Sequence, residues 1–130
     1  MPVRDVLRGD VETGLCTVFV EHTTAAIGVN ENERRLRADT EAFLSELVPD
    51  SGHRHDELDD NADAHLRATL VGPGETIPVR DGRLALGTWQ SILLYDFDGP
   101  RRRMVSVTVV EELPKESSGS TMTVSPASRL

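Results

Sequence analysis

The residues best suited to metal chemistry gather in one stretch of the chain. Three of the four histidines, His53, His55 and His65, fall between positions 53 and 65, together with several aspartates and a glutamate. Neutral imidazole is the commonest protein ligand of zinc and related metals, and carboxylates behind a ligating histidine fix its tautomer. Because the spacing matches no standard zinc motif, the stretch alone predicts either a metal site or an acidic, solvated loop.

Acidic charge is concentrated around the same stretch. The chain carries a formal net charge of −8, and residues 31–63 hold eleven acidic side chains against four arginines. Such a region attracts cations, whereas binding to nucleic acids or anionic lipids needs clustered basic side chains. We therefore expect a small-molecule substrate, no nucleic acid and no membrane partner. No apolar run is long enough to span a bilayer and no secretion signal is visible, which favours a cytoplasmic protein.

Three further features are candidates for a site. His22 ends an apolar run, and on its own such a residue most simply forms local hydrogen bonds. Thr88, Trp89 and Gln90 follow Gly87 between two strand patterns, as expected either for a β-bulge or for an aromatic wall and an amide at a pocket rim. The run 101–103 of three arginines follows a Gly-Pro turn and would either clamp a phosphate or carboxylate or face solvent.

The hydrophobic pattern predicts the elements that position these residues. Apolar residues at helical spacing predict a helix over residues 32–48, which Pro49 ends. A second helix is expected to begin near Asp60 or Asn61, either of which is a good N-cap, and to end at the run 72–74. Short turns between the later strands favour antiparallel pairing, including a hairpin around residues 98–100. The expected strands span residues 15–20, 26–29, 76–79, 84–86, 91–97 and 104–109.

Length and composition indicate one domain. The sequence has 130 residues and a single cysteine, which excludes an intrachain disulfide. We expect an α+β domain over residues 1–113, with one or two helical turns within residues 3–8. The tail 114–130 is rich in serine, lacks periodicity and is predicted to be disordered.

Several strings of this sequence resemble the YjbQ-like family, also called the secondary thiamine-phosphate synthase family. They include VFVEHTTAA at residues 18–26 and DGRLALGTWQ at residues 81–90. The resemblance runs from about residue 3 to residue 110, and further matching strings lie at residues 30–32, 47–49, 54–57, 60–65 and 99–103.

The resemblance implies an α+β fold built on an antiparallel β-sandwich with two main helices, assembled as a homotrimer. It also implies a pocket in which His22, His55 and His65 gather around a divalent metal, with zinc expected. His53 stands where the family usually has another residue and is left out of the ligand set. Members usually begin with an extra strand and a longer first helix, so an edge of the sheet is expected to be missing here. Either the true start of the protein lies upstream, or another subunit covers that edge.

The resemblance implies a transferase that joins a pyrimidine diphosphate to a thiazole phosphate and releases pyrophosphate. In that reaction a metal would screen the diphosphate, and Arg102 or Arg103 would hold a terminal phosphate. A second hypothesis is metal-assisted hydrolysis, in which Glu31 or Asp63 takes the proton of an activated water. A third is a non-enzymatic module that binds a metal or a small metabolite.

Overall fold

The computed structural model describes residues 11–113 of the chain. The helical turn expected within residues 3–8 and the tail expected over residues 114–130 lie outside that part. The described elements, in chain order, are β1 (Gly14–Val20), β2 (Ala25–Asn30), α1 (Arg34–Leu47), the 3₁₀ helix η2 (Arg54–Glu57), α2 (Ala62–Val71), β3 (Gly74–Arg80), β4 (Arg83–Leu84), β5 (Ser91–Asp96) and β6 (Val105–Glu111). These elements confirm the predicted α+β domain with antiparallel strands and two main helices.

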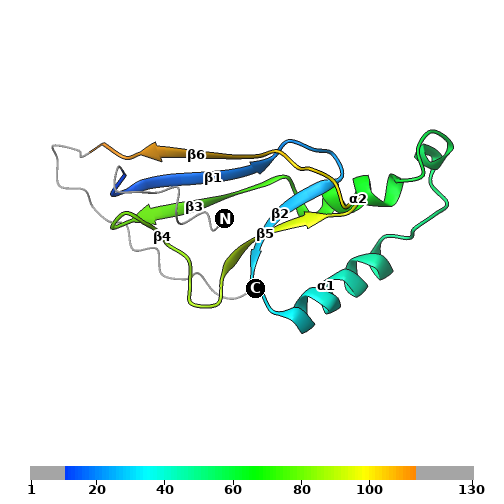
Figure 1. The fold of residues 1–130 in the computed structure, drawn as a ribbon, viewed down its shortest axis with the longest axis horizontal. Helices are drawn as coiled ribbons and strands as arrows, with labels where there is room; N and C mark the ends of the chain where they lie inside the picture. Colours follow the sequence, from blue (N-terminus) through cyan, green and yellow to red (C-terminus); the bar gives the residue numbers. More distant parts are fainter. Residues whose placement is uncertain (1–10, 114–130) are drawn as a thin grey trace, which may run out of the picture.

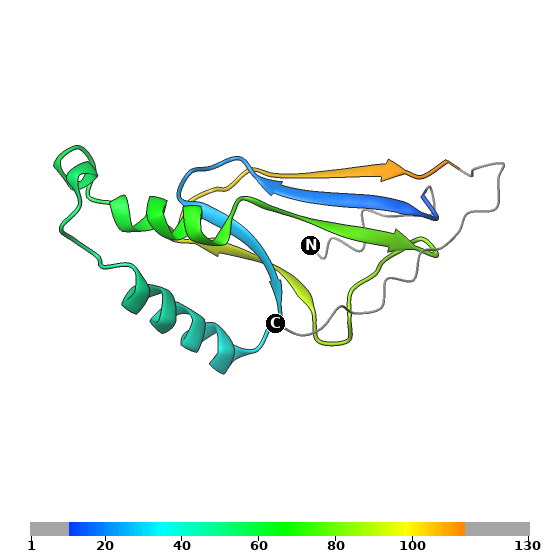
Figure 2. The same ribbon diagram turned by 180° about the vertical axis from the view of Figure 1, so that it is seen from behind.

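The strands form two antiparallel sheets of different size (Figure 1). The larger sheet has the order β4-β3-β1-β6, and the smaller one pairs β2 with β5. Side chains alternate across a strand, so Cys16 and Val18 of β1 face the core, where they pack with Ile27 of β2 and Val79 of β3. Figure 2 shows from behind that both helices lie at one end of the molecule, beyond the larger sheet.

The hairpin expected around residues 98–100 does not form, because β5 and β6 belong to different sheets. Tyr95 of β5 lies opposite Ala26 of β2, whereas β6 pairs with β1 along its whole length. The segment between them therefore crosses from one sheet to the other. It is held by polar contacts, since Arg103 pairs with Asp96 at 2.5 Å. The sequence between β5 and β6 is thus typical of a turn, but β5 pairs with β2 and β6 pairs with β1 instead of with each other.

Helix α1 lies apart from the sheets and exposes much of its apolar stripe. Of that stripe only Leu44 is buried, while Phe43 is 59% and Leu47 is 53% exposed. No described element covers all of this stripe. Among the described residues, no helix is long and apolar enough to cross a membrane.

The buried side chain of Arg67 joins the two helices. From α2, its Nη2 donates to the carbonyl oxygen of Val48 at 2.9 Å and its Nε to that of Leu44 at 3.4 Å. Asp63 and Asp50 each pair with the guanidinium at 2.7 Å. The guanidinium thus satisfies the carbonyl of Val48 at the carboxyl end of α1, and it adds a longer bond to that of Leu44, which also accepts the N–H of Val48.

We expect the substitution Arg67→Met to lower the free energy of unfolding by about 3 kcal/mol, because it leaves the partly buried carboxylate of Asp63 and the carbonyl of Val48 unpaired. Urea denaturation followed by circular dichroism measures this loss. The matched control is Arg34→Ala on the exposed first turn of α1, for which a change within about 0.5 kcal/mol is expected. Equal losses in the two variants would contradict the role given to Arg67.

Candidate functional site

Two of the three candidate metal ligands meet in the structure. His55 lies on η2 and His65 lies on the first half of α2. Their ring centroids are 4.8 Å apart and the ring planes cross at 84°, which is an edge-to-face contact. The Nε2 atom of His55 is buried and has no hydrogen-bond partner among the described residues. Such an atom costs free energy that a bound ligand would recover.

Asp56 holds η2 against the start of α2. One oxygen of its carboxylate accepts the backbone N–H of His53, and the other accepts that of Ala62, each at 3.3 Å. The second bond satisfies one of the free amides at the start of α2. The ring of His53 is instead bonded through Nε2 to the carbonyl oxygen of Pro49 at 2.8 Å. This polar stretch is therefore ordered by hydrogen bonds although it buries little apolar surface.

His22 lies near the pair but is engaged by the backbone. It follows β1, and its Nε2 accepts the N–H of Met104 at 2.7 Å. In a neutral ring this bond places the proton on Nδ1, so neither nitrogen has a lone pair free in this arrangement. His22 and His65 nevertheless line the same open pocket of about 540 Å³, together with Phe19 and Thr69.

The donor set fits a metal ion in part. Within residues 11–113, no group of three or more His, Cys, Asp or Glu side chains is close enough to share an ion. The structure brings His55 and His65 together and places His22 on the wall of a pocket that His65 also lines. Two adjacent imidazoles, one with a buried nitrogen that lacks a partner, provide part of a ligand set of the kind that zinc prefers.

The arginine segment lies next to His22, because Met104 follows it directly. Arg101 pairs with Asp98 at 3.2 Å, and Arg103 pairs with Asp96. The hydrogen bond from Arg103 is the main cause that holds the pKa of Asp96 below its usual value. Arg102 is exposed and forms no ion pair with any described residue. It is therefore the arginine of this segment that remains available to an anion.

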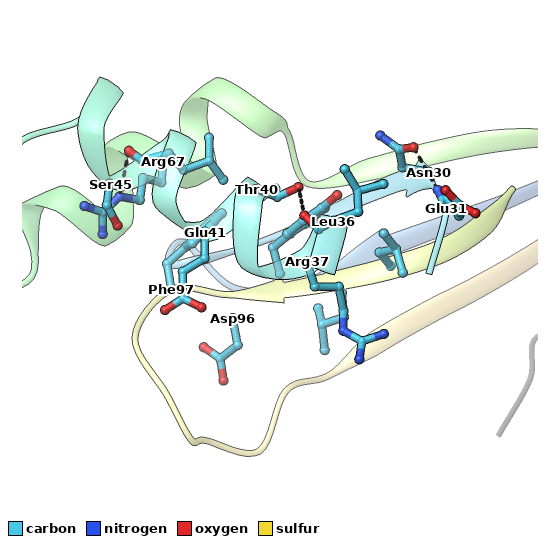
Figure 3. Close-up of a pocket in the computed structure, with 14 residues that line it drawn as sticks. Asn30, Glu31, Leu36, Arg37, Thr40, Glu41, Ser45, Arg67, Asp96 and Phe97 are labelled. Atoms are coloured by element: carbon cyan, nitrogen blue, oxygen red, sulfur yellow. Dashed lines mark hydrogen bonds between the residues drawn. The ribbon is translucent and has the colours of Figure 1, made fainter. Parts of the chain in front are cut away.

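The two predicted proton acceptors lie away from the histidines. Glu31 lines a second pocket of about 350 Å³ between α1 and β5, which also contains Tyr95 and Phe97 (Figure 3). Asp63 shares α2 with His65, but its carboxylate pairs with Arg67. Neither residue lines the pocket of His22 and His65.

The loop of Thr88, Trp89 and Gln90 precedes β5, at the opposite end of that strand from Asp96 (Figure 1). The side chain of Gln90 accepts the backbone N–H of Gly87 at 2.8 Å, which closes the loop on itself. Trp89 is 74% exposed. Within one chain, this loop and the histidines are therefore separate surfaces.

The comparison with protein families agrees with the arrangement of these motifs. A sequence model described as UPF0047 protein YjbQ-like matches residues 2–112. The chain belongs to the YjbQ-like family. A UPF0047 protein of Archaeoglobus fulgidus is 55% identical over 95 residues, which cover 72% of this chain and 75% of that relative. The UPF0047 protein YjbQ of Salmonella typhimurium is 40% identical over 77% of this chain and 78% of its own length.

Solved structures of the YjbQ-like family share the fold. A hypothetical protein from Aeropyrum pernix has a TM-score of 0.80 at 43% identity, with 86% of this chain and 88% of that chain covered. A protein from Sulfolobus solfataricus, described as being of unknown function, has a TM-score of 0.79 at 39% identity, with 86% of each chain covered. These names give the family and the fold, and they state no substrate.

Sequence reasoning missed two residues of this YjbQ-like site. Glu21 lines the pocket of His22 and His65, and its position directly before His22 was the signal available. Asn61 was interpreted only as the N-cap of α2, yet the oxygen of its side chain is buried without a hydrogen-bond partner among the described residues. Nothing in the residue pattern distinguishes such an asparagine from an ordinary helix cap.

Proposed function

We propose that this chain binds a divalent metal ion, zinc in the first instance, and acts on a phosphorylated small molecule. The observation that supports it most strongly is the contact between the His55 and His65 rings, with the Nε2 atom of His55 buried and unpartnered. His22 is proposed as a third ligand. To bind the metal, its Nε2 would have to give up the hydrogen bond that it accepts from the N–H of Met104. When bound, the metal would supply positive charge next to the substrate.

Arg102 supports an anionic substrate at this pocket. The overall charge of −8 opposes anion binding. A positively charged side chain must therefore make the electrostatic potential positive where the substrate binds. Arg102 is two residues from the contact between Met104 and His22 and forms no ion pair with a described residue. Guanidinium groups bind phosphate oxygens with two parallel hydrogen bonds, which gives both affinity and orientation.

The leading reaction in this proposal is the one that the family resemblance implies. It joins a pyrimidine diphosphate to a thiazole phosphate, giving thiamine phosphate and pyrophosphate. Arg102 would hold a phosphate group as the bond to pyrophosphate breaks and the bond to the thiazole nitrogen forms. In the alternative of metal-assisted hydrolysis, Glu21 at the wall of the pocket would accept the proton of the attacking water. Glu31 and Asp63 are less suited, since Glu31 lines the other pocket and Asp63 is paired with Arg67.

Homotrimer formation in the cytoplasm is part of the same proposal. Phe43, Leu47 and Trp89 are exposed apolar side chains that association of subunits would cover. A neighbouring subunit could then bring its loop of Thr88, Trp89 and Gln90 to the histidine pocket. Light scattering after size-exclusion chromatography measures the mass of the assembly.

Pyrophosphate release tests the proposed reaction. Protein saturated with zinc is expected to release pyrophosphate from the two phosphorylated precursors and to form thiamine phosphate in equal amounts. Protein stripped with a chelator is expected to lose this turnover and to regain it when zinc is added back. Turnover that is identical with and without metal would contradict the proposal. Release of phosphate without thiamine phosphate would favour metal-assisted hydrolysis instead.

A further inference from the structure

Asn61 occupies the N-cap position of α2, but its side chain does not cap the helix. The N–H of Ala62, the first residue of the helix, donates to Oδ1 of Asp56. The N–H of Ala64, one of the two amides that an N-cap side chain would serve, donates to the backbone carbonyl of Asn61 at 3.1 Å. The Nδ2 of Asn61 donates instead to Oδ2 of Asp98 at 3.0 Å. That bond identifies which side of the amide is the nitrogen, and it leaves Oδ1 directed elsewhere.

Two polar side-chain atoms of this region, Oδ1 of Asn61 and Nε2 of His55, lack the hydrogen bonds that buried polar atoms normally form. Both atoms are buried, and neither has a hydrogen-bond partner among the described residues. Each unpaired buried group costs about 1–3 kcal/mol, so folded proteins seldom keep two of them close together in the chain. A ligand that accepts electron pairs from both atoms would remove both costs.

Backbone contacts place Asn61 in the same turn as the two histidines. The carbonyl of His55 accepts the N–H of Asp59 at 3.0 Å, and the carbonyl of Asp59 accepts the N–H of Asn61 at 2.7 Å. The carbonyl of Asn61 in turn accepts the N–H of His65 at 3.3 Å. The contact between the rings of His55 and His65 joins the two ends of this series of hydrogen bonds. Asn61 therefore lies one helical turn before His65, on the side that η2 covers.

We propose that Oδ1 of Asn61 is an oxygen ligand of the metal ion held by His55 and His65. This inference rests on the proposed metal-binding function and adds an oxygen donor to the two imidazoles. An amide oxygen is neutral and harder than imidazole, so a mixed set of this kind also accepts manganese or cobalt. Asp98 holds the amide in place, and because Asp98 also pairs with Arg101, it connects this ligand to the arginine segment.

Cobalt titration of the full-length chain tests the role of Asn61. The variant Asn61→Leu removes both polar atoms at similar volume and is expected to weaken cobalt and zinc binding about tenfold or more. Its cobalt absorption spectrum is expected to change in shape, since one donor is lost. Asn61→Asp keeps an oxygen donor but sets a second carboxylate against that of Asp98, so its metal affinity is expected to lie between those of Asn61→Leu and the native chain.

The control variant Asp60→Ala changes the exposed residue directly before Asn61 and touches neither side-chain atom of Asn61, so its metal affinity is expected to stay within about threefold. The melting temperature measured without metal shows whether Asn61 acts as a metal ligand or only supports the fold. Because Asn61→Leu removes a buried unpaired group, it is expected to lower that melting temperature only slightly. Native affinity in Asn61→Leu, with metal still bound by the native chain, would overturn this inference alone. Absence of metal binding in the native chain would overturn both this inference and the proposed function.

Discussion

Replacement of His55 or His65 with alanine is expected to reduce zinc affinity about a hundredfold or more, because each change removes one of two adjacent imidazoles. A competition titration with a coloured chelator measures the affinity, and elemental analysis of the purified protein measures the bound stoichiometry. Both single variants are expected to lose stoichiometric zinc. His22→Ala is expected to lose less, since Nε2 of His22 already accepts a backbone amide.

The chain provides a matched control for these histidine variants. His53 lies two residues before His55 in the same acidic stretch, but its ring is bonded to the carbonyl of Pro49. His53→Ala is therefore expected to keep native stoichiometry and an affinity within about threefold of the native chain. If His53→Ala lost as much zinc as His55→Ala, the ligand in this stretch would have been assigned to the wrong histidine.

The second large effect is expected from Arg102→Ala, which removes the arginine that forms no ion pair with a described residue. Loss of a charge-assisted bond to phosphate corresponds to about 1.5–3 kcal/mol, or roughly a tenfold to hundredfold weaker affinity. Inorganic pyrophosphate is a suitable probe, and calorimetric titration of the zinc-loaded protein measures its dissociation constant. The affinity is expected to fall steeply as salt is added, because exposed charges are screened.

Arg35→Ala is the comparison variant for Arg102→Ala. Arg35 is also exposed, but it lies on α1 and faces Glu33. Its replacement removes the same charge from a surface that does not adjoin the histidine pocket, so pyrophosphate affinity is expected to change by less than about twofold. Equal losses in both variants would mean that pyrophosphate responds only to net charge, and the phosphate-binding role of Arg102 would be abandoned.

Local patterns in the sequence were sufficient to predict the two main helices and the strands, but not η2, which lies in a stretch that was expected to be a loop, nor every strand pairing. The helical stripe and Pro49 gave α1 within a few residues, and Asn61 and Gly72 bracket α2 as expected. The turn at residues 98–100 suggested a hairpin, but β5 joins β2 and β6 joins β1. A turn signal is local, whereas strand pairing depends on which distant strand offers a matching apolar row.

Two of the three histidines that the family resemblance groups together are in contact, whereas His22 is bonded to the backbone of Met104. His55 and His65 meet as expected, although ten positions separate them. The partner of the Asp63 carboxylate was harder to predict, because this side chain could face either the histidines or Arg67, four residues later on α2. Opposite charges at that spacing commonly pair on a helix. Arg67 is buried because it donates to carbonyl groups at the end of α1. No local pattern in the sequence indicates that this end of α1 lies against α2.

The central claim is that a metal ion binds between His55 and His65, and anomalous diffraction from crystals grown with zinc tests it most directly. A peak is expected about 2.0–2.1 Å from Nε2 of His55 and from a ring nitrogen of His65, the normal zinc–nitrogen distance. Oδ1 of Asn61 is expected beside the same peak. Anomalous density found only at other surface residues, with both rings unliganded in crystals that contain zinc, would contradict the account.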